Sequence, residues 1–288
     1  MSDLKLPILV FTDLDGTLLD HDSYSFSAAN KAINKLKSLN IPIIPVTSKT
    51  LSELEALLNA LDLDSPVIAE NGGIIATPKG KFKGFKSDIS YKNFDVLQLS
   101  PVYSVINHTL REIREKYKLH FTGFNDLTVK TVAELTGLTI IQSFQAKERL
   151  CSEPLVWQDS PENLLRFEKI LNEMDFSLTR GGRFYHVMGK TDKGKSMLKL
   201  SGLYPGNNLN IALGDSPNDI SMLSAADFSA VINRKNNIPL VLDKRPEFLY
   251  ESVASGPSGW QEFFDYFFKN FVNKENNEFI NIKVDNNG

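Results

Sequence analysis

The sequence near the N-terminus reads Leu9-Val10-Phe11-Thr12-Asp13-Leu14-Asp15-Gly16-Thr17-Leu18. The apolar run is typical of a buried strand, which delivers two carboxylates on alternate residues and then a glycine at which the chain can turn. Side chains two residues apart in a strand share a face, so Asp13 and Asp15 are expected to point to one place. Two negatively charged carboxylates held so near each other repel, which destabilises the fold unless a cation lies between them or a reaction uses them. The stretch therefore predicts a functional site, whereas the plainer interpretation is a strand-end turn that happens to carry two aspartates.

Strand and helix patterns alternate in the first and last parts of the chain. Apolar runs predict strands at residues 7–12, 41–47, 67–69, 209–213 and 228–232. Apolar residues at helical spacing predict helices at residues 27–39, 51–61, 192–201, 217–225 and 259–271. This alternation predicts an α/β fold, a doubly wound parallel sheet with a Rossmann-like core. After the third strand, Glu70-Asn71-Gly72-Gly73 carries a hairpin-turn signal.

The pattern changes in the middle of the chain, from about residue 85. Helices are predicted at residues 102–117, 127–135 and 160–174, the second opened by Asp126 and the third by Ser160-Pro161-Glu162. Short strands are predicted at residues 155–157, 177–179 and 183–188. This mixture predicts an inserted α+β cap domain. We therefore divide the chain into a core at residues 1–84 and 189–272, a cap at residues 85–188 and a polar tail at residues 273–288, with an edge strand at residues 278–284.

The composition limits the classes of function that fit the sequence. The 288 residues are 42% hydrophobic and 23% charged, which is usual for a globular protein. A net charge of −3 and a pI near 5.9 give no support for binding nucleic acid or a membrane surface. The single cysteine, Cys151, fits a reducing compartment, and no apolar run is long enough to span a bilayer. We therefore expect a cytoplasmic protein that binds neither nucleic acid nor a membrane, with the oligomeric state left open.

Polar side chains gather where the predicted core strands end. In an open α/β sheet, sites form beyond the carboxyl ends of the strands. The residues expected at this edge are Asp13, Asp15, Thr47, Ser48, Lys49, Lys193, Asp215, Asn218 and Asp219. Clustered carboxylates without histidine or cysteine favour Mg²⁺, while hydroxyls, ammonium groups and helix N-termini bind phosphate. A carboxylate in line with phosphorus can act as nucleophile, and a second can protonate the leaving oxygen and later activate water.

These motifs, in this order, resemble the haloacid-dehalogenase-type phosphatase superfamily. The matching residues are Asp13-x-Asp15-Gly16-Thr17, Thr47, Lys193 and Gly214-Asp215-x-x-Asn218-Asp219. The resemblance implies that Asp13 is the nucleophile, that Asp15 is the acid and base, and that Thr47 and Lys193 bind phosphate. It places Mg²⁺ on Asp13, the backbone carbonyl of Asp15 and Asp215, with Asp219 close by or acting through water.

Finer features resemble the mannosyl-3-phosphoglycerate phosphatase family. They are Asp20-His21-Asp22-Ser23-Tyr24-Ser25-Phe26, Thr47-Ser48-Lys49-Thr50, Glu70-Asn71-Gly72-Gly73, Arg149 with Ser152-Glu153-Pro154, and Gly181-Gly182-Arg183-Phe184 with His186. The resemblance implies a Mg²⁺-dependent enzyme of mannosylglycerate biosynthesis that releases phosphate from mannosyl- or glucosyl-3-phosphoglycerate. Such a substrate carries a phosphomonoester, a carboxylate and a hexose.

The cap is expected to recognise the part of the substrate beyond the phosphate. The candidate substrate-binding residues are Ser48, Lys49, Arg149, Ser152, Glu153, Arg180, Arg183, His186 and Asn218. The three arginines suit a carboxylate or spare phosphate oxygens, and Ser152, Glu153 and His186 suit sugar hydroxyls. Two alternatives stay open: His186 as a structural histidine of the cap, and Lys49 as a cap of the helix that follows it.

Other functions have to be weighed. Gly189-Lys190-Thr191-Asp192-Lys193-Gly194-Lys195-Ser196 matches the nucleotide-binding P-loop pattern. A P-loop would put Asp192 inside a ring of N–H groups that binds polyphosphate, and it would leave Asp13 and Asp15 unused. Within the resembling superfamily, the alternatives are another sugar-phosphate phosphatase, such as a sucrose-phosphate type, and a phosphomutase. From a different class, the chain could be an inactive binding module on the same fold.

Overall fold

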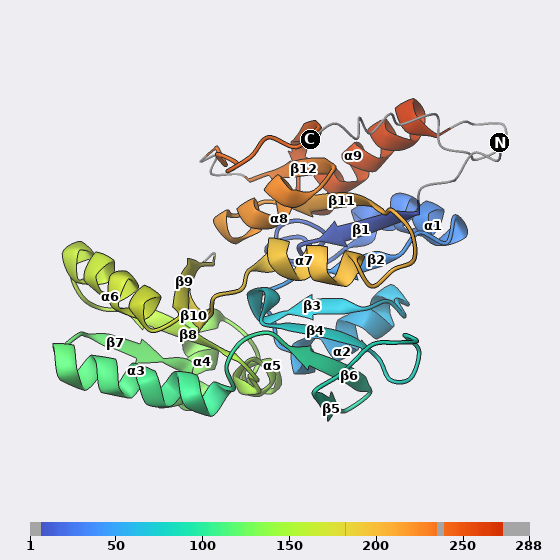
Figure 1. The fold of residues 1–288 in the computed structure, drawn as a ribbon. Helices are drawn as coiled ribbons and strands as arrows, with labels where there is room; N and C mark the ends of the chain where they lie inside the picture. Colours follow the sequence, from blue (N-terminus) through green and yellow to red (C-terminus); the bar gives the residue numbers. More distant parts are fainter. Residues whose placement is uncertain (1–6, 182, 235–238, 273–288) are drawn as a thin grey trace.

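The central sheet of the core is parallel, in the strand order β13-β12-β11-β1-β2 (Figure 1). The structure is a computed structural model and describes residues 7–181, 183–234 and 239–272. The strands are β1 (Ile8–Thr12), β2 (Ile43–Pro45), β11 (Leu209–Gly214), β12 (Phe228–Asn233) and β13 (Phe248–Ser255). All neighbours in this sheet pair in parallel, so the predicted α/β class is confirmed.

Alternate residues of β1 enter two different hydrophobic clusters, one on each face of the sheet. Val10 packs in a cluster with residues of α1 (Asn30–Ser38) and α9 (Gly256–Phe271). Phe11 packs with residues of α7 (Lys193–Ser201) and α8 (Ile220–Ala225). The sheet is therefore covered by helices on both faces, as a doubly wound fold requires. The predicted terminal helix docks on the core through Trp260, Phe263, Phe264 and Phe267, all completely buried.

A second, antiparallel sheet extends the core, in the order β3-β4-β6-β5. Its strands are β3 (Val67–Ala69), β4 (Ile74–Pro78), β5 (Ile89–Tyr91) and β6 (Phe94–Gln98). A parallel bridge from Val46 to Ile68 joins it to β2, and β3 and β4 form the hairpin predicted at residues 70–73. The sequence analysis missed β4, β5 and β6. Because β5 and β6 pair with β4 and not with the cap, a domain boundary near residue 100 fits the pairing better than the predicted residue 85.

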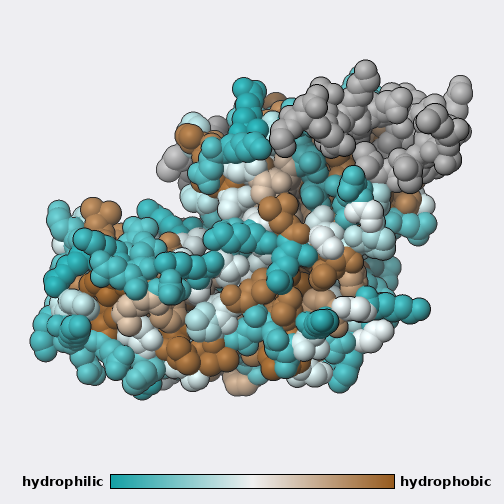
Figure 2. All heavy atoms as spheres, viewed as in Figure 1, coloured by the Kyte–Doolittle hydropathy of each residue, from teal (hydrophilic) through white to brown (hydrophobic). Residues whose placement is uncertain are grey.

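The cap is built around an antiparallel sheet in the order β7-β8-β10-β9. These strands are β7 (Phe121–Gly123), β8 (Ser152–Trp157), β9 (Phe176–Arg180) and β10 (Tyr185–Gly189). Helices α3 (Tyr103–Tyr117) and α6 (Pro161–Glu173) share a hydrophobic cluster with this sheet that includes Ile106, Phe167 and Val187. Figure 1 shows the cap as a separate lobe at the lower left. In the same view, hydrophilic side chains predominate on the outer face around α6 (Figure 2).

Several expectations about the remaining elements were wrong. The helix predicted at residues 127–135 is α4 (Val129–Thr136), and its N-cap is Thr128, whose side chain accepts from Thr131 N–H. Asp126 instead accepts from Gly123 N–H and pairs with Arg114. The sequence analysis also missed β13 and the helix α5 (Ile140–Lys147). The edge strand predicted at residues 278–284 lies outside the described residues. None of the helices that the structure describes is long and apolar enough to cross a bilayer.

Candidate active site

The ends of β1 and β11 meet at the sheet edge. The N–H of Asp13 donates to the carbonyl of Leu213 (2.9 Å), and Thr17 Oγ1 donates to Asp215 Oδ1 (3.1 Å). Gly16 has a φ of +88°, and a Cβ at this position would lie 2.8 Å from Asp215 Oδ2. Glycine is therefore required both for the left-handed backbone and for the close approach of the two loops.

Three buried carboxylates form a group that could hold a metal ion. Oxygens of Asp13, Asp215 and Asp219 all lie within 4.8 Å of one another. Lys193 Nζ is fully buried and lies 2.6 Å from both Asp13 Oδ1 and Asp219 Oδ1. The other oxygen of Asp219 accepts from the N–H groups of Asp215 and Ser216. The lysine holds two of the carboxylates in place, and a hard divalent cation fits the excess of negative charge.

The pKa values in this group follow from burial and crowding. Burial, followed by the charge of Asp219, raises the pKa of Asp13 well above its ordinary value and that of Asp215 to about 7. Burial alone would lower the pKa of Lys193, but the charges of Asp13 and Asp219 outweigh it and raise this pKa. The lysine therefore stays protonated, while Asp13 and Asp215 need a further positive charge to be fully ionised.

The end of β2 supplies polar residues beside the carboxylates. Thr47 is buried, and its hydroxyl accepts from Lys49 N–H (3.2 Å). Lys49 Nζ pairs with Asp15 Oδ2 (2.9 Å) and lies 5.2 Å from the centre of the Tyr24 ring. The alternative that Lys49 caps the next helix is wrong, because Thr50 is the N-cap of α2 (Leu51–Leu61). Lys49 instead faces the pocket beside Asp15.

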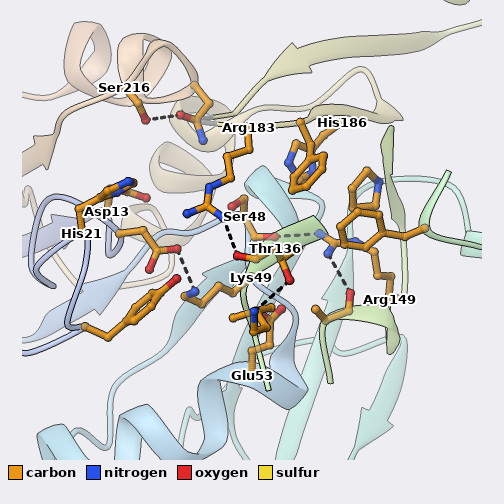
Figure 3. Close-up of a pocket in the computed structure, with 18 of the residues that line it drawn as sticks. Asp13, His21, Ser48, Lys49, Glu53, Thr136, Arg149, Arg183, His186 and Ser216 are labelled. Atoms are coloured by element: carbon orange, nitrogen blue, oxygen red, sulfur yellow. Dashed lines mark hydrogen bonds and ion pairs between the residues drawn. The ribbon is translucent and has the colours of Figure 1, made fainter. Parts of the chain in front are cut away.

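An open pocket lies between the core and the cap (Figure 3). On the core side it is lined by Asp13, Asp15, His21, Tyr24, Ser48, Lys49, Glu53, Ser216, Asn218 and Arg234. On the cap side it is lined by Phe124, Thr136, Leu138, Ala146, Arg149, Pro154, Arg183, Phe184 and His186. Asn218 donates to Asn71 Oδ1 (2.9 Å), which orients its amide at the rim. Because Asp13 belongs to both the carboxylate group and the pocket lining, a ligand in the pocket would reach the site of an ion.

The cap wall is basic and partly aromatic. Arg149 donates to the carbonyl of Ser48 (2.8 Å), and Arg183 donates to the carbonyl of Thr136 (2.5 Å). His186 is 7% exposed, and its Nδ1 is buried without a hydrogen-bond partner among the described residues. Burial, and then the charges of Arg149 and Lys193, lower the pKa of His186 to about 3. The imidazole is therefore neutral at neutral pH.

Three of the predicted substrate-binding residues have other contacts. Ser152 is fully buried, and its hydroxyl donates to Glu70 (2.7 Å). Glu153 lies in the cap interior, where it accepts from Tyr103 Oη (2.6 Å) and Asn125 N–H (2.7 Å). Arg180 lies over the ring of Tyr185, 5.7 Å from its centre. In the described part of the chain, none of these three lines the pocket, so this geometry does not support a direct role for them.

The sequence analysis missed several pocket residues. Arg234 directly follows β12 and lies 3.0 Å from Asp215 Oδ2, measured from its Nε. The rule that sites form at strand ends could have found it. Phe124 and Phe184 form an edge-to-face pair with ring centres 5.1 Å apart. No local pattern marked Phe124, since it follows a short cap strand that was also missed.

The P-loop interpretation is wrong. Asp192 is the N-cap of α7, and its carboxylate accepts from Lys195 N–H (2.8 Å). This side chain occupies the helix N-terminus that a P-loop would offer to a phosphate. Lys195, the residue that would bind the nucleotide, is 63% exposed and pairs with Asp192.

Comparison with known proteins places the chain in a family. The family profile described as haloacid dehalogenase-like hydrolase matches residues 10–241. The chain belongs to the haloacid dehalogenase-like hydrolases. Two curated relatives are both named glucosyl-3-phosphoglycerate/mannosyl-3-phosphoglycerate phosphatase. That of Methanococcoides burtonii is 36% identical, with 88% of this chain and 94% of the relative covered. That of Persephonella marina is 35% identical, with 88% and 95% covered.

Solved structures share the fold at lower identity. A protein of Thermoplasma acidophilum has a TM-score of 0.64 and 21% identity, with 91% of this chain and 98% of that chain covered. The sucrose-phosphatase of Synechocystis has a TM-score of 0.54 and 15% identity, with 91% and 98% covered. At such identities the likeness shows the arrangement of core and cap, and nothing about the substrate.

Proposed function

We propose that this hydrolase is a Mg²⁺-dependent phosphatase that releases phosphate from glucosyl- or mannosyl-3-phosphoglycerate. The observation that carries the proposal is that Asp13 belongs both to the buried carboxylate group and to the pocket lining. The names of the two curated relatives support the choice of substrate.

The proposed reaction divides the work among the core residues. A carboxylate oxygen of Asp13 attacks phosphorus, while Asp15 gives a proton to the departing sugar-acid oxygen. Asp15 then takes a proton from a water molecule, whose oxygen attacks phosphorus and releases phosphate and free Asp13. Thr47 and Lys193 hold the phosphate oxygens during both steps.

The ion would be held by the carboxylates at the sheet edge. Asp13, the backbone carbonyl of Asp15, Asp215 and Asp219 are the proposed ligands, and their oxygens are the donors that Mg²⁺ prefers. Bound there, the ion supplies positive charge that keeps the carboxylates ionised and offsets the charge of the phosphate.

The pocket wall fits the rest of the substrate. Arg149 and Arg183 place positive charge on this wall, which suits the glycerate carboxylate. The neutral His186 can accept or donate a hydrogen bond to a sugar hydroxyl. Phe124 and Phe184 offer ring surface to the apolar face of a hexose.

The test is phosphate release from a panel of phosphorylated compounds. It includes glucosyl- and mannosyl-3-phosphoglycerate, sucrose phosphate and simple hexose phosphates, each with Mg²⁺ and with a chelator. We expect the highest kcat/KM for a glycosyl-3-phosphoglycerate, with free phosphate as product. Preference for another sugar phosphate would refute the proposed substrate, and transfer of the phosphoryl group back to the product would indicate a mutase.

The variant Asp13→Asn tests the nucleophile. It should abolish turnover while the circular dichroism spectrum stays unchanged, whereas Asp64→Asn, in a surface ion pair with Lys81, should retain full activity. Turnover by Asp13→Asn above about one per cent of the parent would contradict the assignment.

A further inference from the structure

Glu70 is a buried carboxylate of the core that holds a segment of the cap. It is completely buried and has a φ of +51° in the turn after β3. Its oxygens accept from the N–H groups of Leu150 (2.7 Å) and Cys151 (3.1 Å) and from Ser152 Oγ (2.7 Å). A carboxylate that receives so many donors fixes the backbone at the start of β8.

The same carboxylate faces a buried arginine of the pocket wall. Arg149 Nε lies 3.8 Å from Glu70 Oε2, and the arginine side chain is 3% exposed. The guanidinium group also donates to the carbonyl of Ser48 (2.8 Å) and that of Ala146 (3.2 Å). Arg149 Nε also donates to Ser152 Oγ (3.1 Å), and this hydroxyl donates to Glu70 (2.7 Å). A buried guanidinium is stable only with hydrogen bonds and a counter-charge, so Glu70 positions Arg149 both by its charge and through Ser152.

The turn that carries Glu70 also forms hydrogen bonds to the loop at the end of β2. Glu70 N–H donates to the carbonyl of Lys49 (3.0 Å), and Asn71 N–H donates to the carbonyl of Thr47 (2.9 Å). One turn therefore holds both ends of the Thr47–Lys49 loop, while Arg149 bonds to Ser48 in its middle. The phosphate side of the pocket and the cap wall are joined through these contacts.

We propose that Glu70 is a positioning residue that sets Arg149 against Ser48, so that the cap wall and the phosphate loop engage one substrate together. This inference rests on the proposed function of the pocket. It has a specific consequence: loss of Glu70 should impair substrates that extend to Arg149, and should affect much less a small aryl phosphate that engages only the core residues.

The test compares Glu70→Gln with the matched variant Glu148→Gln. Glu148 lies on the same segment and accepts from Ser52, but its side chain is 33% exposed. Gln at position 70 removes the charge and turns an NH₂ group toward N–H donors. We expect kcat/KM for the glycosyl-3-phosphoglycerate to fall by about tenfold or more, and that for p-nitrophenyl phosphate to fall by less than about threefold. Glu148→Gln should change both by less than about twofold.

A double variant separates positioning from general stability. If Glu70 acts through Arg149, Glu70→Gln should add almost nothing to the loss caused by Arg149→Met. Equal losses on both substrates, or additive losses in the double variant, would overturn the inference. Should Glu70→Gln fail to fold, Ser152→Ala keeps the charge of Glu70 but removes the hydroxyl that links this carboxylate to Arg149, and it should show the same selective loss at about threefold.

Different experimental results would contradict this inference and the proposed function. If the parent enzyme ignores glycosyl-3-phosphoglycerates but hydrolyses another sugar phosphate, the proposed substrate is wrong. The same variants are then compared on that sugar phosphate and on p-nitrophenyl phosphate. A selective loss there still supports the role of Glu70, and a uniform loss refutes it.

Discussion

Replacement of Glu153 by glutamine should make the cap more stable at alkaline pH. The Glu153 side chain is completely buried, and burial raises its pKa to about 7. The folded chain therefore binds this proton more tightly than the unfolded chain, whose glutamate has a pKa near 4.5. The resulting stability is fully present below pH 4.5 and is lost as the pH rises to about 7. That difference in pKa corresponds to about 3 kcal/mol in the free energy of unfolding.

Glutamine keeps the geometry and removes the titration. Its carbonyl can accept from Asn125 N–H, and its amide can donate to Tyr103 Oη, so both contacts of Glu153 survive. The assay is urea unfolding of the parent and of Glu153→Gln at pH 5 and pH 8. Other titrating groups cancel in the difference between the two proteins.

We expect the difference in the free energy of unfolding between Glu153→Gln and the parent to grow by about 2.5 kcal/mol between the two pH values, because a small part of the effect is already present at pH 5. Glu173→Gln, at an exposed glutamate on the cap surface, is the matched control and should follow the parent at both. Parallel stabilities of the parent and Glu153→Gln would refute the reasoning, because they would mean that Glu153 titrates normally despite its burial.

Three further variants test the core. In the presence of a chelator, Lys193→Met should lower the free energy of unfolding by about 3–5 kcal/mol, because Asp13 loses its buried partner. A decrease of less than about 1 kcal/mol, measured by urea unfolding, would contradict this. Lys195→Ala should leave phosphate release unchanged, whereas a tenfold loss would restore the P-loop interpretation. Arg234→Gln should strengthen Mg²⁺ binding about fivefold, because the arginine competes with the ion for Asp215. Titration calorimetry measures this affinity, and weaker binding by the variant would contradict the competition.

The core was predictable because its signals are local. Strands buried on both faces, such as β1 and β11, are nearly continuous apolar runs, and the strand-end rule then places the polar residues that follow them at one edge. Two of the missed strands lack such runs. Strand β5 is largely exposed, and β13 mixes polar and apolar residues at the edge of the sheet. Helix α5 was missed because it exposes Ile141 and Phe144 and so lacks one apolar face.

The cap residues depend on register, which the sequence does not reveal. His186 pairs with Pro154 across the β8–β10 ladder, and both line the pocket. Glu153, one residue earlier, points to the opposite face and enters the cap interior. Ser152 shares the face of Pro154, yet it is covered by Glu70 from the core. The pattern of residue types could not distinguish these three environments, because contacts between segments far apart in the chain determine where each side chain lies.

The core wall and the cap wall of the pocket differ in charge, so they are suited to different parts of a substrate. At the sheet edge, Asp13, Asp215 and Asp219 face Lys193 and Arg234, so the three carboxylates outnumber the two cations and repel a phosphate dianion when all three are ionised. The opposite wall carries arginines and a neutral histidine, which attract a carboxylate at any pH near neutrality. Under the proposed function, a substrate with an anion at each end would bind to the cap through its carboxylate before its phosphate could bind favourably at the core. Under the proposed function, a cation bound by the carboxylates would make that second contact attractive, and it would then act on orientation as well as on chemistry.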